Sequence, residues 1–149
     1  MARTLVLPNI FFEEVANQLR EGNDVTVSVQ GDSMYPFLHS GDTIRLRPYQ
    51  EGEELPLFCA VFYKWEGHYM THRVVRKDAT SYTMLGDGNV YRFETLPAKD
   101  ILGVLVSCCR PDGCSIDCLS SHWLRRGRFW YWLRPLRRYL LWIMKKFSR

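Results

Sequence analysis

A serine and a histidine occupy settings that suit nucleophilic catalysis. Ser33 lies in the segment Gly31-Asp32-Ser33-Met34-Tyr35-Pro36, where glycine and proline indicate a tight turn after a strand. His72 lies in Thr71-His72-Arg73-Val74, on a strand expected later in the chain. A serine hydroxyl becomes a good nucleophile when a neighbouring base takes its proton, and histidine suits this task because its reference pKa is about 6.5. The two segments therefore predict an acyl-transfer centre.

These segments resemble, in their order and separation, the motifs of a known peptidase superfamily. That superfamily joins the type I signal peptidases and the self-cleaving LexA-like repressor peptidases. The nucleophile segment is similar to its Gly-x-Ser-Met-x-Pro box, and Gly41-Asp42 is similar to the Gly-Asp that follows. Thr71-His72-Arg73-Val74 resembles the base box, and Leu85-Gly86-Asp87-Gly88-Asn89 resembles the Gly-Asp-Asn box. The four boxes together cover residues 24–107.

The resemblance implies a role for each site residue. A histidine at the base position is typical of the endoplasmic-reticulum and archaeal signal peptidases, which use serine, histidine and aspartate. It implies Ser33 as nucleophile, His72 as general base and Asp87 as the acid that orients the histidine, with Asp32 as a second candidate for that acid. The neighbours expected to line the substrate or oxyanion site are Gly31, Asp32 and Met34. This chemistry requires no metal or cofactor.

The chain departs from the family pattern in three places. Gly31 stands where many signal peptidases have a second serine, and the acidic pair expected after the Gly-Asp-Asn box is reduced to Glu94. The usual membrane-spanning helix before the nucleophile is missing. We therefore expect processing of one particular leader or precursor peptide. That peptide would add as an extra strand beside the strand after Ser33 and the strand that bears His72.

The hydrophobic pattern predicts the elements that position these groups. An amphipathic helix is expected at 9–21, and strands are expected at 25–29, 44–46, 58–64, 68–76, 81–85 and 101–107. Many short strands without a long internal helix favour a mostly β fold, a half-open antiparallel barrel of the signal-peptidase/LexA type. The expected division is a catalytic domain at 1–109, a linker at 110–121 and a basic amphipathic tail at 122–149.

The charge of the chain is distributed unevenly. The formal net charge is +4, yet residues 122–149 contain nine Lys/Arg and no acid, which leaves 11 bases and 16 acids in residues 1–121. Tryptophans and tyrosines alternate with these bases, and Pro135 is expected to break the tail into two helical pieces. This composition favours an anionic membrane surface as the partner, with peripheral association on the cytoplasmic side. A protein partner and nucleic acid are the alternatives, and nucleic acid is the least favoured.

Two further alternatives concern the cysteines and the activity. Cys108, Cys109, Cys114 and Cys118 lack the paired Cys-x-x-Cys spacing of zinc knuckles, so reduced thiols are favoured over a metal site. The same fold without turnover would be a peptide-binding or regulatory module. A repressor acting on DNA is disfavoured, because the region before Val25 is too short for a helix-turn-helix. The serine endopeptidase is the preferred interpretation.

Overall fold

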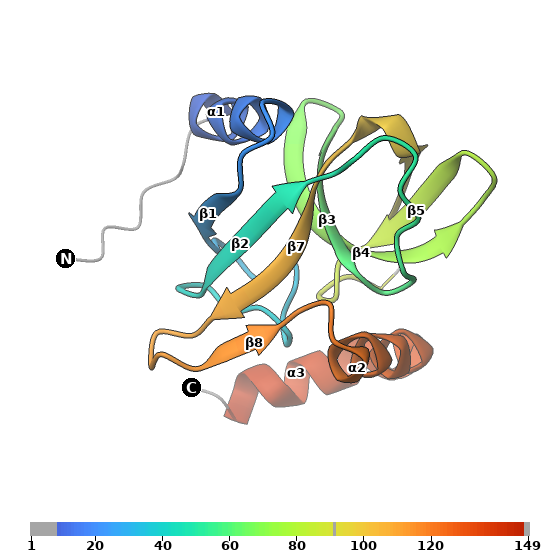
Figure 1. The fold of residues 1–149 in the computed structure, drawn as a ribbon. Helices are drawn as coiled ribbons and strands as arrows, with labels where there is room; N and C mark the ends of the chain where they lie inside the picture. Colours follow the sequence, from blue (N-terminus) through green and yellow to red (C-terminus); the bar gives the residue numbers. More distant parts are fainter. Residues whose placement is uncertain (1–8, 91, 148–149) are drawn as a thin grey trace.

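The computed structural model describes residues 9–90 and 92–147. The helices are α1 (Asn9–Arg20), α2 (Ser121–Trp132) and α3 (Arg137–Phe147), with 3-10 turns at Ala98–Asp100 and Arg134–Leu136. The strands are β1 (Val25–Ser28), β2 (Thr43–Pro48), β3 (Ala60–Trp65), β4 (His68–Lys77), β5 (Ser81–Leu85), β6 (Phe93–Pro97), β7 (Ile101–Cys109) and β8 (Ser115–Asp117). In Figure 1, α1 lies above the strands, and α2 and α3 lie below them.

Within the described residues, the eight strands form one sheet in which every pairing is antiparallel. The order is β1-β2-β7-β3-β4-β5-β6, with β8 paired to β7. No pairing between the described strands joins β1 to β6, so the sheet is not closed. The prediction of a mostly antiparallel β fold with a short N-terminal helix and C-terminal helices is confirmed.

Most of the expected elements form within a few residues of their predicted bounds. The helix predicted at 9–21 is α1, and Gly22 follows it with a φ of +91°, a conformation that ends helices readily at glycine. Two strands were not predicted. β6 is short and ends in Pro97, and β8 has three residues inside a segment rich in turn residues.

The helix α1 packs on the sheet through the face that its sequence predicts. Val15 and Leu19 are buried in the larger hydrophobic core, and Phe12 packs against this core from its margin. The phenyl ring of Phe12 also stacks on Tyr69 of β4, with ring centroids 6.2 Å apart. The helix therefore covers one side of the region between β1 and β4, where Ser33 is found.

The C-terminal helices are part of the same core. Trp123 and Trp130 of α2 and Leu141 of α3 are buried with Met34 and Phe37, which follow Ser33 in sequence. The predicted break at Pro135 is confirmed, since it lies in the 3-10 turn between α2 and α3. Residues 110–121, expected to be a linker, contain β8 and the Ser120 side chain that caps α2. The inner faces of α2 and α3 are thus packed against the sheet and the turn that contains Ser33.

Candidate active site

Ser33 lies in a turn between β1 and β2 that is closed at its base by backbone hydrogen bonds. Val29 N donates to Asp42 O, and Gly41 N donates to Val29 O. The buried carboxylate of Asp42 accepts from His39 N at 2.8 Å and pairs with Arg110. Asp42 therefore anchors the segment that follows the nucleophile, while Ser33 itself is exposed.

His72 lies on β4, where its ring is buried beside a carboxylate. The acid is Glu94 of β6, whose Oε1 lies 2.7 Å from His72 Nδ1. A carboxylate only accepts hydrogen bonds, so Nδ1 carries the ring proton and Nε2 is left to accept one. The Tyr63 hydroxyl donates to the same Glu94 oxygen at 2.6 Å and lies 3.1 Å from Nδ1. The orientation of the imidazole is fixed by these two partners.

The burial of this cluster also affects Tyr63. Desolvation raises the pKa of its phenol well above the ordinary value, and the hydrogen bond to Glu94 raises it further. The phenol therefore stays protonated and acts as a permanent donor to Glu94. This leaves the carboxylate with two donors, which compensates for the cost of burying it.

The Nε2 side of His72 faces, across Gly86, the turn of residues 31–36, which we call the nucleophile turn after the role expected for Ser33. A Cβ atom placed on Gly86 would lie 3.0 Å from His72 Nε2 and 2.6 Å from Ser33 O. The loop after β5 is held against the turn by a hydrogen bond from Gly88 N to Ser33 O, 2.8 Å long. Among the described residues, the Ser33 hydroxyl has no hydrogen-bond partner. The hydrogen bond between a nucleophilic hydroxyl and its base is often long in the free enzyme and tightens only when substrate binds.

Asp87 does not contact His72. Its two oxygens accept from Nε and Nη2 of Arg73 at 2.8 and 2.7 Å, and both side chains are buried. The Arg73 guanidinium lies between the rings of Phe37 and Trp123, 4.5 and 4.1 Å from their centroids. The second candidate acid, Asp32, pairs with Lys145 of α3 at 2.6 Å. The acid beside His72 is therefore Glu94 in place of either aspartate.

The turn also presents backbone donors. Within the described part of the chain, the N–H groups of Ser33 and Met34 donate to no acceptor. Unpaired N–H groups beside a nucleophile can stabilise the negative oxygen of a tetrahedral intermediate. Gly31, with a φ of +79°, permits the sharp bend that exposes this stretch.

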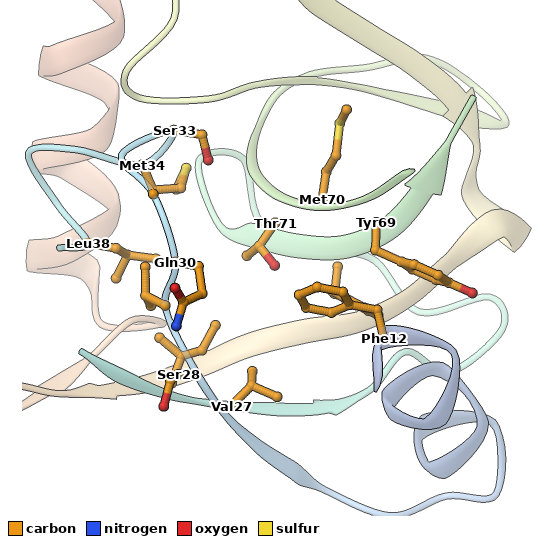
Figure 2. A pocket seen from close by; sticks show the side chains of 14 residues that line it. Phe12, Val27, Ser28, Gln30, Ser33, Met34, Leu38, Tyr69, Met70 and Thr71 are labelled. Atoms are coloured by element: carbon orange, nitrogen blue, oxygen red, sulfur yellow. The ribbon is translucent and has the colours of Figure 1, made fainter. Parts of the chain in front are cut away.

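A cavity of about 160 Å³ opens beside Ser33. Figure 2 shows Ser33 at one end of it, with Thr71, Met70 and Tyr69 of β4 along one side and Val27 and Ser28 of β1 along another. Gly31 and Met34 line it as well, together with mostly apolar side chains from α1 and the core. The cavity is therefore suited to small apolar side chains next to the nucleophile.

The strands on the two sides of this cavity have free edges. β1 is the last strand of the sheet order, and residues 68–72 of β4 pair only with β3 in the described structure, because β5 begins its pairing at Arg73. The strand after Ser33, β2, lies between β1 and β7 and has no free edge. The strand next to Ser33 that has a free edge is thus β1, which precedes it, and the expectation that an added peptide would lie beside the following strand is wrong because that strand has two neighbours.

All five cysteines are free, and the described residues contain no group of three His, Cys, Asp or Glu side chains that could hold a metal ion. No helix in residues 9–90 and 92–147 has the length and apolarity needed to cross a membrane.

Comparison of the chain with models of protein families and with curated protein sequences found no match. Function is therefore inferred from the site and from the motif resemblance.

Proposed function

We propose that this protein is a serine endopeptidase with a Ser33–His72–Glu94 centre. The observation that carries the proposal is the buried chain from Tyr63 through Glu94 to His72, which leaves Nε2 facing the exposed nucleophile turn across Gly86. A buried carboxylate–histidine pair aimed at a serine turn is the arrangement that acyl transfer requires. The half-open barrel of the signal-peptidase/LexA type is the fold to which we assign the antiparallel sheet.

In the proposed reaction, Ser33 Oγ attacks the scissile carbonyl carbon and His72 Nε2 takes the hydroxyl proton. The imidazolium that forms is stabilised by Glu94, and the carbonyl oxygen becomes negative beside the unpaired N–H groups of the turn. Collapse of the intermediate breaks the C–N bond, and the leaving amine takes the proton from Nε2. Water then attacks the acyl-enzyme with His72 as base, releasing the new carboxyl end and restoring Ser33.

The substrate we propose is an extended segment of a leader or precursor peptide. It would add as a strand between the free edges of β1 and residues 68–72 of β4, with a small apolar side chain in the cavity beside Ser33. Alternate side chains of an extended peptide point in opposite directions, so every second residue would face the cavity. Such a groove selects peptides by shape and apolar character.

The test is labelling with a fluorophosphonate probe, which reacts with activated serines. The wild-type protein should be labelled, and Ser33→Ala and His72→Ala should not be. Labelling should fall at acid pH, because a protonated imidazole cannot accept the serine proton. Ser28→Ala, an exposed serine of β1 near the same cavity, serves as the matched control and should be labelled like wild type. Absence of labelling in folded wild-type protein would overturn the proposal in favour of a non-catalytic peptide-binding module.

A further inference from the structure

The outward faces of α2 and α3 carry aromatic and basic side chains in alternation. On α3 the exposed positions recur at helical spacing, and on α2 the exposed aromatics lie one turn apart. We call this set of exposed residues the aromatic–basic face; it consists of Arg125, Arg128, Phe129, Trp132, Arg138, Tyr139, Trp142, Ile143, Lys146 and Phe147. Trp132, Trp142 and Phe147 are 65%, 63% and 80% exposed, which is unusual for side chains of this size.

The charge of this face is not neutralised by the protein. No acidic residue follows Asp117 in the sequence. Within the described residues, Arg125, Arg128, Arg138 and Lys146 form no ion pair with a carboxylate. The face is therefore complementary to an anionic surface.

The bases and the rings of this face are paired side by side. The Arg128 guanidinium lies 4.9 Å from the centroid of the Trp132 ring, and Lys146 Nζ lies 4.8 Å from that of Trp142. At the boundary between lipid headgroups and acyl chains, an indole ring occupies the interface while a neighbouring base reaches a phosphate. Each pair therefore presents an indole ring and a basic group at the same point on the face.

The orientation of the face is fixed by contacts on the opposite side of the helices. Trp130 Nε1 donates to Asp87 O at 2.8 Å, and the buried guanidinium of Arg137 donates to Asn89 O at 2.5 Å. Leu141 is buried one turn further along α3. Because both helices are held from within, the exposed aromatic–basic face points away from the core. In Figure 1 both helices lie at the lower margin of the molecule.

We propose that the aromatic–basic face docks on the surface of an anionic lipid bilayer, with α2 and α3 lying in the headgroup region. Aromatic side chains alternating with bases are typical of helices that bind in this plane. The phosphates of a nucleic acid could bind the same arginine and lysine side chains. However, the exposed aliphatic side chains Leu136 and Ile143, 55% and 43% exposed, fit hydrocarbon and have no counterpart in phosphate or base contacts.

This docking would bring the nucleophile close to the membrane. Lys145 lies next to Lys146 of the face and pairs with Asp32, the residue before Ser33. A helix with its side chains is about 10–12 Å across, so the nucleophile turn would lie within about one helix diameter of the headgroups. Resting on the proposed function, this predicts that the scissile bond of the precursor lies near a membrane surface.

The test is co-sedimentation of the full chain with lipid vesicles, measured without any hydrolysis. Vesicles of equal phosphatidylglycerol and phosphatidylcholine should bind the protein at least about tenfold more tightly than phosphatidylcholine alone. Two triple variants should each weaken binding about tenfold or more. One removes aromatic rings, Trp132→Ser/Trp142→Ser/Phe147→Ser, and the other removes positive charge, Arg128→Gln/Arg138→Gln/Lys146→Gln. The matched control is Arg20→Gln/Arg76→Gln/Lys99→Gln, which removes three exposed bases outside the aromatic–basic face and should bind within about twofold of wild type.

A second measurement decides the matter if a triple variant fails to fold. Brominated lipids in the anionic vesicles should quench part of the tryptophan fluorescence of the wild-type protein, and Trp132→Phe/Trp142→Phe should remove this quenching. Three tryptophans remain as unquenched emitters, the buried Trp123 and Trp130 and the half-buried Trp65 of β3, which lies outside the face. Equal binding to both kinds of vesicle, no quenching, or binding to duplex DNA that survives loss of the aromatics would overturn the proposal.

The peptidase and membrane proposals fail independently. Ser33→Ala should bind anionic vesicles as wild type does, because Ser33 lies outside the aromatic–basic face. If vesicles are bound but no serine is labelled, only the peptidase assignment is lost.

Discussion

The carboxylate of Glu94 reaches His72 from a strand that is not its neighbour. Glu94 lies on β6, His72 on β4, and β5 separates them in the sheet. β5 ends opposite Arg73, with Leu85 as the partner residue, so the space beside His72 is not filled by a β5 side chain. The contact of 2.7 Å between Glu94 Oε1 and His72 Nδ1 forms in that space. Orientation of the base therefore depends on β6 being paired in register.

The first prediction separates the roles of the two buried acids. Glu94→Gln keeps the shape of the side chain but removes the charge that stabilises the imidazolium, so the rate of fluorophosphonate labelling should fall by roughly 10²- to 10⁴-fold. Asp87→Asn should instead lower the free energy of unfolding by about 3 kcal/mol or more, because it leaves the buried Arg73 guanidinium unpaired. Labelling kinetics and urea denaturation measure the two effects. Unchanged labelling in folded Glu94→Gln would remove Glu94 from the proposed centre.

The second prediction concerns Gly86, which separates the nucleophile turn from the base. Gly86→Ala should slow labelling of Ser33 at least about tenfold, because the added methyl group would meet Ser33 O and His72 Nε2 at 2.6 and 3.0 Å. Gly52→Ala is the control. It strains a backbone with a φ of +85° and costs about 1 kcal/mol of stability, but has no atom within 4 Å of the new methyl group. Equal labelling of the two variants would show that Gly86 has no special place in the site.

The third prediction tests the packing of α2 against Arg73 of β4. A glycine-to-alanine change inside a helix is normally stabilising by roughly 0.5–1 kcal/mol. At Gly127 the added Cβ would overlap the guanidinium of Arg73, so Gly127→Ala should lower the free energy of unfolding by about 1–3 kcal/mol. Chemical denaturation measures the change. Arg125→Ala, an exposed position on the same helix, should have little effect, and a stabilised Gly127→Ala would contradict the packing described.

The fourth prediction concerns the thiols. Burial raises the pKa of Cys59 and Cys118 to about 12 and that of Cys108 to about 11, so these thiols stay protonated at pH 8. Cys109 and Cys114 are exposed. A thiol–disulfide exchange reagent at pH 8 should therefore modify two of the five cysteines rapidly in native protein, and the other three only on unfolding. Rapid reaction of three or more would show that a buried thiol is accessible.

Much of the sheet is predictable from local pattern, because alternating apolar residues with turn signals mark most of the strands. β6 escaped prediction for a physical reason. Its inward positions are Glu94 and Leu96, so a charged residue occupies a place that a half-buried strand normally gives to an apolar one. The acid that contacts His72 thus concealed the strand that carries it. The signal for this strand is the alternation of buried and exposed positions, with Glu94 and Leu96 buried on either side of the exposed Thr95.

Pairing between distant side chains is less accessible to sequence reasoning. Asp87 follows a turn glycine and lies in the expected box, yet the residue after His72 is an arginine that binds both of its oxygens. The choice between Asp87 and Glu94 depends on which face of β4 each acid meets. Successive residues of a strand point to opposite faces, so His72 and Arg73 select different partners. Only the three-dimensional register determines which acid meets which face.

The contact between Lys145 and Asp32 joins residues 113 positions apart, and Arg137 binds the loop at Gly86 and Asn89 from 51 and 48 positions away. During synthesis, the nucleophile turn leaves the ribosome long before the helix that supports it. A nascent chain is therefore expected to carry Ser33, His72 and Glu94 without the braces that hold their loops. On the proposed function, hydrolytic competence would arise only after α3 has been made, which would delay activity until translation of that helix is complete.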